Sequence, residues 1–291
     1  MEKTKSRDGT EIAFDRIGEG PPVILIGGAF SWRRWKGFVE LADLLAAGFT
    51  VLNYDRRGRG DSGDTKPYTL QREFEDLQAM ISAAGGAASV WGLSSGGILA
   101  LEAARAGVAI ERIAAYEPPF IVDAAGGVPP EDLVPHVTGL IQRDRRSEAV
   151  SYFMARVMGM PSVIPSAMRL WPPLWSRLKA TAHTLPYDAE LIDRHVRGRP
   201  VDDAYWARVA TPTLVVSGDK SPEKLRKGAA AIAAALPDAE HRPLPGVSHN
   251  VKMDVLAPVL AEFFAGHPGS AQEGSANEAA ARRAPSLRPG R

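Results

Sequence analysis

Short apolar runs that alternate with amphipathic segments constrain the fold of this chain more than any other feature. Residues 23–26 are fully apolar and end in Gly27-Gly28, as expected of a strand buried on both faces. Strands are predicted over 10–17, 23–26, 50–54, 88–91, 113–116, 213–216 and 240–244, and helices over 35–46, 70–84, 96–106, 222–236 and 251–264. Strands separated by helices form βαβ units. The expected fold is therefore α/β, with a mostly parallel sheet covered by helices on both faces.

This rhythm stops between about residues 118 and 207, where prolines recur and no convincing strand is found. Helical patterns there cover 133–142, 147–158 and 188–197. We therefore predict a core of residues 1–118 and 208–266 with an inserted helical cap at 119–207. Residues 267–291 hold Leu287 as their only large apolar side chain and are predicted to be a disordered tail.

Composition excludes several classes of function. The 291 residues include no cysteine, which rules out disulfides, thiol nucleophiles and cysteine-based metal sites. Lys and Arg number 35 against 34 Asp and Glu, so net charge favours neither nucleic acid nor an anionic membrane as a partner. The charged start is unlike a secretory signal, and no apolar run reaches the roughly 18 residues of a membrane span. A cytoplasmic protein is expected.

The pentapeptide Gly92-Leu-Ser-Ser-Gly96 fits the pattern G-x-S-x-G between a predicted strand and a predicted helix. In that setting the pattern is typical of a nucleophile elbow, a strained turn that lifts the serine hydroxyl above the sheet. Larger side chains at Gly92 or Gly96 would clash with neighbouring backbone. Ser94 is therefore the candidate nucleophile. The alternative is an ordinary Gly/Ser turn before a helix.

A serine hydroxyl needs a base at neutral pH, and the chain has six histidines. His249 follows the last predicted strand, at the sheet edge where open α/β proteins bind ligands. The other five histidines are interpreted as surface or structural. His183 and His195 lack the close spacing of a metal-binding pair, so we predict neither a metal site nor a cofactor.

Together these motifs resemble the α/β-hydrolase family of serine hydrolases. Residues 26–30 (Ile-Gly-Gly-Ala-Phe) and 54–63 (Tyr-Asp-Arg-Arg-Gly-Arg-Gly-Asp-Ser-Gly) are also similar to it, and the resemblance covers about residues 10–265. It implies an eight-stranded sheet with a helical cap between the sixth and seventh strands. It also implies Ser94 as the nucleophile and His249 as the general base and then the general acid. The oxyanion hole would use the N–H groups of Ser95 and Ala29, with Phe30 as the neighbouring alternative.

The acid of the triad departs from the family pattern. Relatives often have G-x-x-D-P after the seventh strand, whereas Ser221 stands at that Asp position here and Asp219 comes two residues early. A second family location, at the end of the sixth strand, holds Glu117. Either carboxylate could set the His249 tautomer and stabilise its protonated form, so both stay candidates.

The expected substrate pocket is apolar. Trp32, Arg33 and Trp35 follow the oxyanion strand, and Trp32 is our candidate for lining the acyl pocket. The cap side chains that suit an apolar lid are Phe153, Met154, Met158, Trp171 and Trp175. The loop that holds Asp55, Arg56, Arg57 and Arg59 is interpreted as a structural loop whose charges pair with one another.

These residues predict a serine hydrolase that cleaves a carboxylic ester of small to medium apolar groups through an acyl-enzyme on Ser94. A thioesterase, lactonase, carbon–carbon bond hydrolase or acyltransferase would use the same residues, and a non-catalytic ligand-binding relative would keep the pocket. The expected partner is a small acyl substrate. The oligomeric state does not follow from the sequence.

Overall fold

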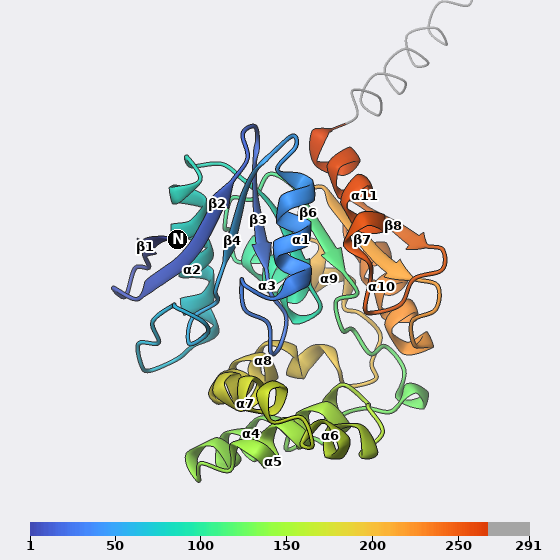
Figure 1. The fold of residues 1–291 in the computed structure, drawn as a ribbon. Helices are drawn as coiled ribbons and strands as arrows, with labels where there is room; N and C mark the ends of the chain where they lie inside the picture. The colour runs from blue at the N-terminus through green and yellow to red at the C-terminus, as the bar shows by residue number, and fades with distance from the viewer. Residues whose placement is uncertain (267–291) are drawn as a thin grey trace, which may run out of the picture.

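The computed structural model describes residues 1–266 and places eight strands in one sheet (Figure 1). The strands are β1 (Glu2–Lys5), β2 (Glu11–Ile17), β3 (Pro22–Ile26), β4 (Thr50–Tyr54), β5 (Ser89–Leu93), β6 (Ile113–Tyr116), β7 (Thr213–Gly218) and β8 (Ala239–Leu244). Their order across the sheet is β1-β2-β4-β3-β5-β6-β7-β8. The β1–β2 and β2–β4 pairs are antiparallel and all others are parallel. The predicted fold class is confirmed. The predicted disordered tail, residues 267–291, lies outside the described residues.

The residue patterns did not predict strand β1. Its four residues are all polar or charged, so the strand lacks the alternation of apolar and polar side chains by which strands are recognised. They pair along β2, with Lys3 opposite Ala13 and Lys5 opposite Glu11, and form one edge of the sheet. Lysines on an edge strand oppose pairing with another chain, which accounts for a strand without the usual apolar signal.

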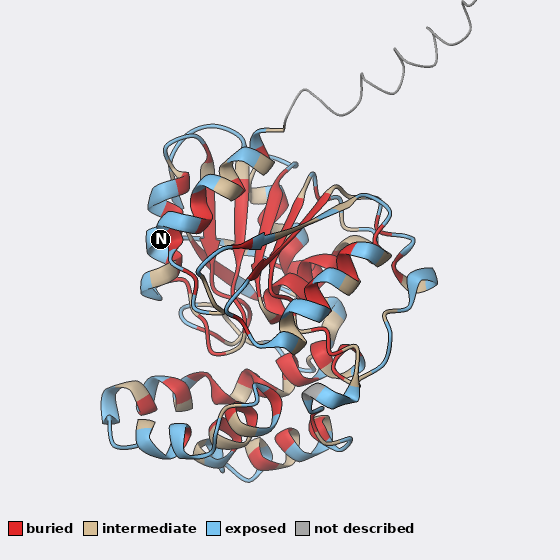
Figure 2. Cartoon of the chain, turned by 90° about the vertical axis from the view of Figure 1, so that its right-hand side faces the viewer, coloured by how far each residue is buried: buried red, intermediate tan, exposed pale blue. Residues whose placement is uncertain are grey.

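Alternate side chains of the central strands enter two separate hydrophobic layers, as the strand period of two requires. In β3, Val23 and Leu25 face one layer, whereas Ile24 and Ile26 face the other. The first layer contains α1 (Lys36–Leu45) and α11 (Met253–Ala265), and the second contains α2 (Leu70–Ala83), α3 (Ser95–Arg105) and α10 (Glu223–Ala235). Both faces of the central strands are therefore buried, as the red strands in Figure 2 show.

The segment between β6 and β7 is helical, and α4 to α8 lie below the sheet in Figure 1. Its α-helices are α4 (Leu133–Gln142), α5 (Arg146–Tyr152), α6 (Val163–Met168), α7 (Pro172–Thr181), α8 (Leu185–Ile192) and α9 (Asp203–Trp206). Its other helical turns are the 3-10 turns η1 (Ala124–Gly126), η3 (Ala182–Thr184) and η4 (Asp193–His195) and the π-helical turn η2 (Phe153–Val157). Apolar side chains of this segment, such as Val150 and Phe153, join the hydrophobic layer that contains α3. The division into a core and a cap domain stays a prediction.

The helices of the described chain are short. The longest, α2, has 14 residues, whereas a bilayer span needs about 20 apolar ones. Within residues 1–266, no helix combines the length and the apolar character required to cross a membrane.

Gly228 of α10 packs directly against the backbone that leaves β6. A Cβ added to Gly228 would lie 1.9 Å from the carbonyl oxygen of Phe120, a backbone atom that cannot rotate away. We expect Gly228→Ala to destabilise the protein by about 1–3 kcal/mol, in spite of the higher helix propensity of alanine, and to lower the Tm by several degrees. Gly48→Ala is the matched control, because an added Cβ there would meet nothing within 4 Å. Equal Tm values in thermal unfolding followed by circular dichroism would contradict this packing argument.

Candidate active site

Ser94 forms the sharp turn between β5 and α3. Its φ of 53° and ψ of −120° lie outside the regions that residues with a Cβ commonly adopt. The Ser94 N–H donates to the carbonyl of Tyr116 at 2.9 Å, and its own carbonyl accepts from the Gly97 N–H at 2.9 Å. Strand β6 and the first turn of α3 thus hold the strained residue from two sides. The strand, turn and helix lie where the G-x-S-x-G motif indicated them.

Close backbone contacts around the turn require glycine. A Cβ on Gly92 would lie 2.4 Å from the Gly96 carbonyl oxygen, and a Cβ on Gly96 would lie 2.4 Å from a carbonyl oxygen of β3. In the loop after β3, a Cβ on Gly28 would lie 2.8 Å from the carbonyl oxygen of Leu93. The ends of β3 and β5 are therefore drawn together, and the loop after β3 lies beside Ser94.

His249 lies in the loop between β8 and α11, and the neighbouring strand ends hold this loop in place. The Tyr116 hydroxyl donates to the carbonyl of Ser248 at 2.6 Å. The Gly246 N–H donates to Oδ1 of Asp219 at 2.8 Å. These two contacts fix the loop beside the carboxyl ends of β6 and β7.

Glu117 follows β6 directly, with φ of 45°, and its carboxylate is fully buried. Its Oε2 lies 2.7 Å from Nδ1 of His249, and its Oε1 accepts the N–H of Gly218 at 2.7 Å. Burial alone would raise the pKa of Glu117, but its polar contacts, of which the hydrogen bond from His249 is the strongest, outweigh it and hold the pKa below its ordinary value. The carboxylate is ionised near neutral pH, and Nε2 is the His249 nitrogen left for other partners.

The two candidate acids therefore do different things. Glu117 contacts the His249 ring, whereas Asp219 bonds to the backbone of the same loop. Within residues 1–266, no hydrogen bond or ion pair joins Asp219 to His249. Ser221, at the position where relatives often have Asp, is buried and carries no charge.

One cavity of about 540 Å³ has both Ser94 and His249 in its wall. The His249 side chain is 32% exposed, so the ring is reachable from the cavity. Other predicted site residues in the wall are Ala29, Phe30, Ser95, Trp32, Phe153, Met154 and Met158. No hydrogen bond within the described chain joins the Ser94 hydroxyl to the His249 ring, which is bonded to Glu117. The structure thus brings serine and histidine into one cavity without a direct bond between them.

Trp171 and Trp175 do not line this cavity, contrary to our prediction. Trp171 precedes α7 and is 64% exposed, whereas the buried Trp175 donates its indole N–H to Oγ of Ser147 at 3.0 Å. Leu174 and Leu178 of α7 line the cavity instead. Leu174 and Leu178 are four residues apart and therefore lie on one face of α7.

Sequence reasoning missed the wall residues contributed by α8 and α10. Ile192 and Val196 come from the end of α8 and the turn after it, and Lys224 comes from the first turn of α10. A signal for Lys224 was available: it follows β7 closely, at the carboxyl edge of the sheet where ligands bind. No such local signal marks Ile192 or Val196.

The arginines in the loop after β4 do not pair with Asp55, so the prediction of a self-paired loop is wrong. All three are at least 98% buried, and their partners lie on other elements. The pairs are Arg56–Glu73, Arg57–Asp76, Arg59–Asp188 and Asp55–Arg33. Each pair joins residues at least 17 positions apart, so the local charge pattern could not reveal it.

Asp188 of α8 connects this charge cluster to two backbone segments beside the serine turn. Its Oδ1 accepts from Oγ of Ser95 at 2.9 Å and from Arg56 at 2.8 Å, and its Oδ2 accepts from Arg59 at 2.5 Å. Arg59 also donates to the carbonyl of Gly28 at 2.6 Å. Burial alone would raise the pKa of Asp188, but the charges of Arg59 and Arg56 outweigh it and keep the pKa below its ordinary value. Helix α8 thus contacts the start of α3 directly through Ser95, and it is linked to the loop after β3 through Arg59.

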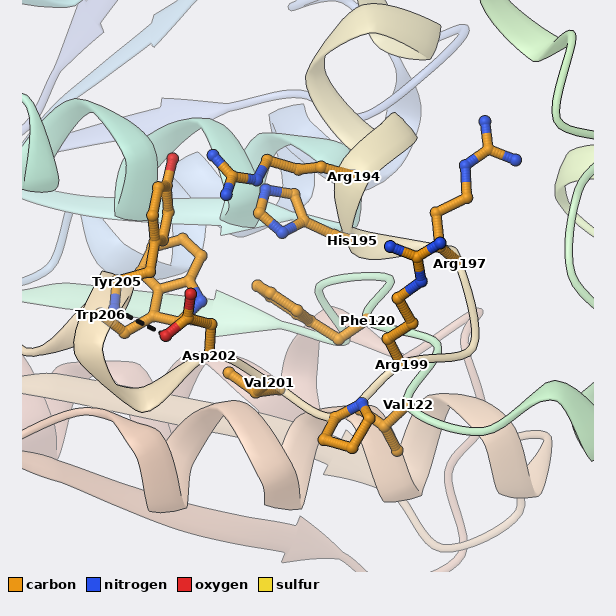
Figure 3. A pocket seen from close by; sticks show the side chains of 11 residues that line it. Phe120, Val122, Arg194, His195, Arg197, Arg199, Val201, Asp202, Tyr205 and Trp206 are labelled. Atoms are coloured by element: carbon orange, nitrogen blue, oxygen red, sulfur yellow. Dashed lines mark hydrogen bonds between the residues drawn. The ribbon is translucent and has the colours of Figure 1, made fainter.

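A second cavity, of about 300 Å³, lies between the segment after β6 and helix α9 (Figure 3). Phe120 and Trp206 form part of its wall, together with the side chains of Arg194, Arg197 and Arg199. His195 in this wall has its Nε2 2.9 Å from Oε1 of Glu102, and burial lowers the pKa of His195. The described residues that line this cavity include no serine or threonine. Among the described residues of this wall, the His195–Glu102 pair therefore has no serine or threonine hydroxyl to activate, and the Tyr205 hydroxyl donates to Glu102.

Comparison with known proteins agrees with this architecture. The sequence model of the Alpha/beta hydrolase family matches residues 23–260. The crystal structure of an alpha/beta hydrolase from Sphaerobacter thermophilus is 46% identical, with a TM-score of 0.83, and the match covers 90% of this chain and 100% of that one. A Rhodococcus esterase is 20% identical (TM-score 0.64; 91% and 98% covered), and an enol-lactonase from Burkholderia xenovorans is 22% identical (TM-score 0.65; 91% and 100% covered). These last two similarities show the fold alone.

The fold and the site define an α/β protein with a strained serine at the carboxyl edge of a parallel sheet. The chain belongs to the alpha/beta hydrolase family. The family expected from the sequence motifs is thereby confirmed.

The Glu117 carboxylate is expected to make stability depend on pH. Because its folded pKa lies below the ordinary value of 4.5, its contribution is fully present above that value and is lost as the pH falls through the folded pKa. The difference in unfolding free energy between the wild type and Glu117→Gln should therefore shrink as the pH falls from about 5.5 toward 3. Urea unfolding at several pH values measures it. A difference that stays constant with pH would show that the charge of Glu117 contributes nothing.

Removing the charge of Asp188 should destabilise the protein strongly. Arg56 and Arg59 would lose a buried counter-charge, so we expect Asp188→Asn to lower the unfolding free energy by about 3–5 kcal/mol. Asp193→Asn is the control, since Asp193 pairs with Arg197 nearer the surface and such pairs contribute about 1 kcal/mol or less. Urea unfolding compares the two variants, and similar losses in both would refute a special role for the buried cluster.

Proposed function

We propose that the protein is a serine hydrolase that cleaves carboxylic esters through an acyl-enzyme on Ser94. One observation carries the proposal. A strained serine at the start of a helix shares a cavity with a histidine whose Nδ1 lies 2.7 Å from a buried carboxylate. Such an arrangement leaves Nε2 of the histidine to accept a proton from the serine.

In the first step, Oγ of Ser94 attacks the ester carbonyl carbon while Nε2 of His249 takes the hydroxyl proton. Negative charge develops on the carbonyl oxygen, and we assign its stabilisation to the N–H groups of Ser95 and Ala29. Ser95 begins α3, so its N–H has no acceptor in a preceding turn and the helix dipole favours an anion there. Phe30, with φ of 63°, is the alternative to Ala29.

Arg59 supports the orientation of the Ala29 amide. The carbonyl of Gly28 and the N–H of Ala29 belong to one planar trans peptide, so they point in opposite directions. Arg59 binds that carbonyl at 2.6 Å, and Ala29 lines the cavity. The guanidinium charge also polarises the peptide in the direction that strengthens its N–H as a donor. The buried arginines thus act on the reaction through the backbone.

The tetrahedral intermediate then collapses. Protonated His249 donates its proton to the leaving alkoxide, the alcohol departs, and the acyl group remains on Ser94. A water molecule attacks the acyl-enzyme with His249 as base, and the proton returns to Oγ as the carboxylic acid leaves. Glu117 holds the histidine tautomer and stabilises the imidazolium in both halves of the cycle.

The cavity favours apolar groups of small to medium size. Its volume of about 540 Å³ lies within the usual range for ligand sites, and Trp32, Phe153 and Leu178 are among its apolar wall residues. We therefore propose esters of small to medium apolar acyl or alcohol groups as substrates.

One set of variants tests this assignment. A fluorophosphonate probe should label the wild type and not Ser94→Ala, since only an activated serine reacts. With a p-nitrophenyl ester, Glu117→Gln should lower kcat by about 10⁴, because the histidine loses the partner that sets its tautomer. Asp219→Asn is the matched control and should stay near the wild type, because Asp219 bonds to the loop backbone.

Circular dichroism must show that each variant is folded. A folded wild type that the probe does not label would favour a non-catalytic binding protein and end the proposal. Equal activity of the Glu117 and Asp219 variants would remove Glu117 as the triad acid while leaving the serine in place.

A further inference from the structure

We propose that the cavity contains a subsite for an anionic group, in which Lys224 binds a carboxylate carried by the substrate at a distance from the ester. The preferred substrates would then be monoesters of dicarboxylic acids, or related acyl compounds with a free carboxylate. This inference rests on the proposed function of the same site, and it names the substrate class.

Lys224 is the only lysine or arginine among the described residues that line the cavity. The described residues of the wall include no Asp or Glu, and besides Lys224 its hydrophilic side chains are serines, His249 and Asn250. Lys224 approaches the segment after η2, since a Cβ added to Gly159 would lie 2.9 Å from its Nζ. The ammonium group thus lies between α10 and the segment near residue 159, both of which line the cavity.

Lys224 has no acidic partner within the described chain, unlike its neighbour Lys227. Lys227, one turn later on α10, lies 2.9 Å from Glu223 and 3.3 Å from Asp123. Lys224 is half-buried, and no carboxylate of residues 1–266 lies within 4.0 Å of it. A charge removed from water without a partner is unfavourable, and burial indeed lowers the pKa of Lys224. A bound anion would supply the counter-charge that the chain does not.

The apolar remainder of the wall restricts what this anion can be. Side chains such as Phe153, Met154 and Leu178 bind hydrocarbon and offer no hydrogen bonds to a highly charged group. A carboxylate on an alkyl or alkenyl chain fits both parts, because its chain meets the apolar wall and its charge meets the ammonium. The scissile carbonyl at Ser94 would then be separated from the charged end by that chain.

The test pairs each charged substrate with a neutral one of the same length. The p-nitrophenyl monoesters of adipate and suberate are compared with p-nitrophenyl hexanoate and octanoate, in which a methyl group replaces the free carboxylate. For the wild type, the ratio of kcat/KM values should favour the charged ester at one of these lengths. Lys224→Met should reduce that ratio about tenfold, mainly through KM, because a hydrogen bond between charged groups is lost.

Two further variants separate a specific contact from general electrostatics. Lys224→Arg should keep most of the preference, since it keeps the charge. Lys227→Met removes the same charge from the same helix but lies outside the cavity wall, so its ratio should equal that of the wild type. Equal ratios in Lys224→Met and Lys227→Met, or no preference for the charged ester in the wild type, would overturn the subsite.

A binding measurement keeps the subsite testable without turnover. Calorimetry with the adipate monoester should give about tenfold weaker binding to Ser94→Ala/Lys224→Met than to Ser94→Ala. Equal binding to both proteins overturns the subsite, even if neutral esters are hydrolysed and the proposed function stands. Weaker binding to the double variant without hydrolysis by the wild type would support the subsite and refute the hydrolase.

Discussion

The strained backbone at Ser94 is the constraint on which the rest of the site depends. Strand β5 ends and helix α3 begins on either side of this one residue, whose φ of 53° is unfavourable for a side chain. The surrounding structure holds the turn in this conformation. The Ser94 N–H donates to the carbonyl of Tyr116 at the end of β6, and glycines at 92 and 96 leave room for close backbone contacts with carbonyl oxygens. The parallel sheet therefore creates the place in which the serine can be held.

Buried charge provides a second level of organisation. Asp188 accepts hydrogen bonds from Ser95, Arg56 and Arg59, and Arg59 in turn binds the carbonyl of Gly28. Buried ion pairs require good geometry on every side, because each unpaired charge is costly away from water. As a result, Asp188 of α8 is linked to both segments beside Ser94: directly to Ser95 at the start of α3, and through Arg59 to the loop after β3. A shift of α8 relative to the sheet would disturb both segments together.

Much of the fold and part of the site were predictable, for local reasons. Strands buried on both faces appear as apolar runs, and the turn at Ser94 appears as glycines at fixed spacing. Strand β1 was not predictable by this route, because an exposed edge strand of charged residues has no apolar alternation. Trp171 and Trp175 were misjudged, because composition indicates an apolar helix but not which of its side chains line the cavity.

The amino-acid sequence by itself determined the family, the layered α/β architecture, and the positions of Ser94 and His249 along the chain. Only the tertiary structure decided which carboxylate contacts His249, where the loop arginines find their partners, and which side chains surround the cavity. The physical reason is separation along the chain. Glu117 and His249 are 132 residues apart, as are Arg56 and Asp188, and their contacts arise from the packing of whole strands and helices. Periodicity and motif spacing describe neighbours in sequence, whereas these contacts join neighbours in space.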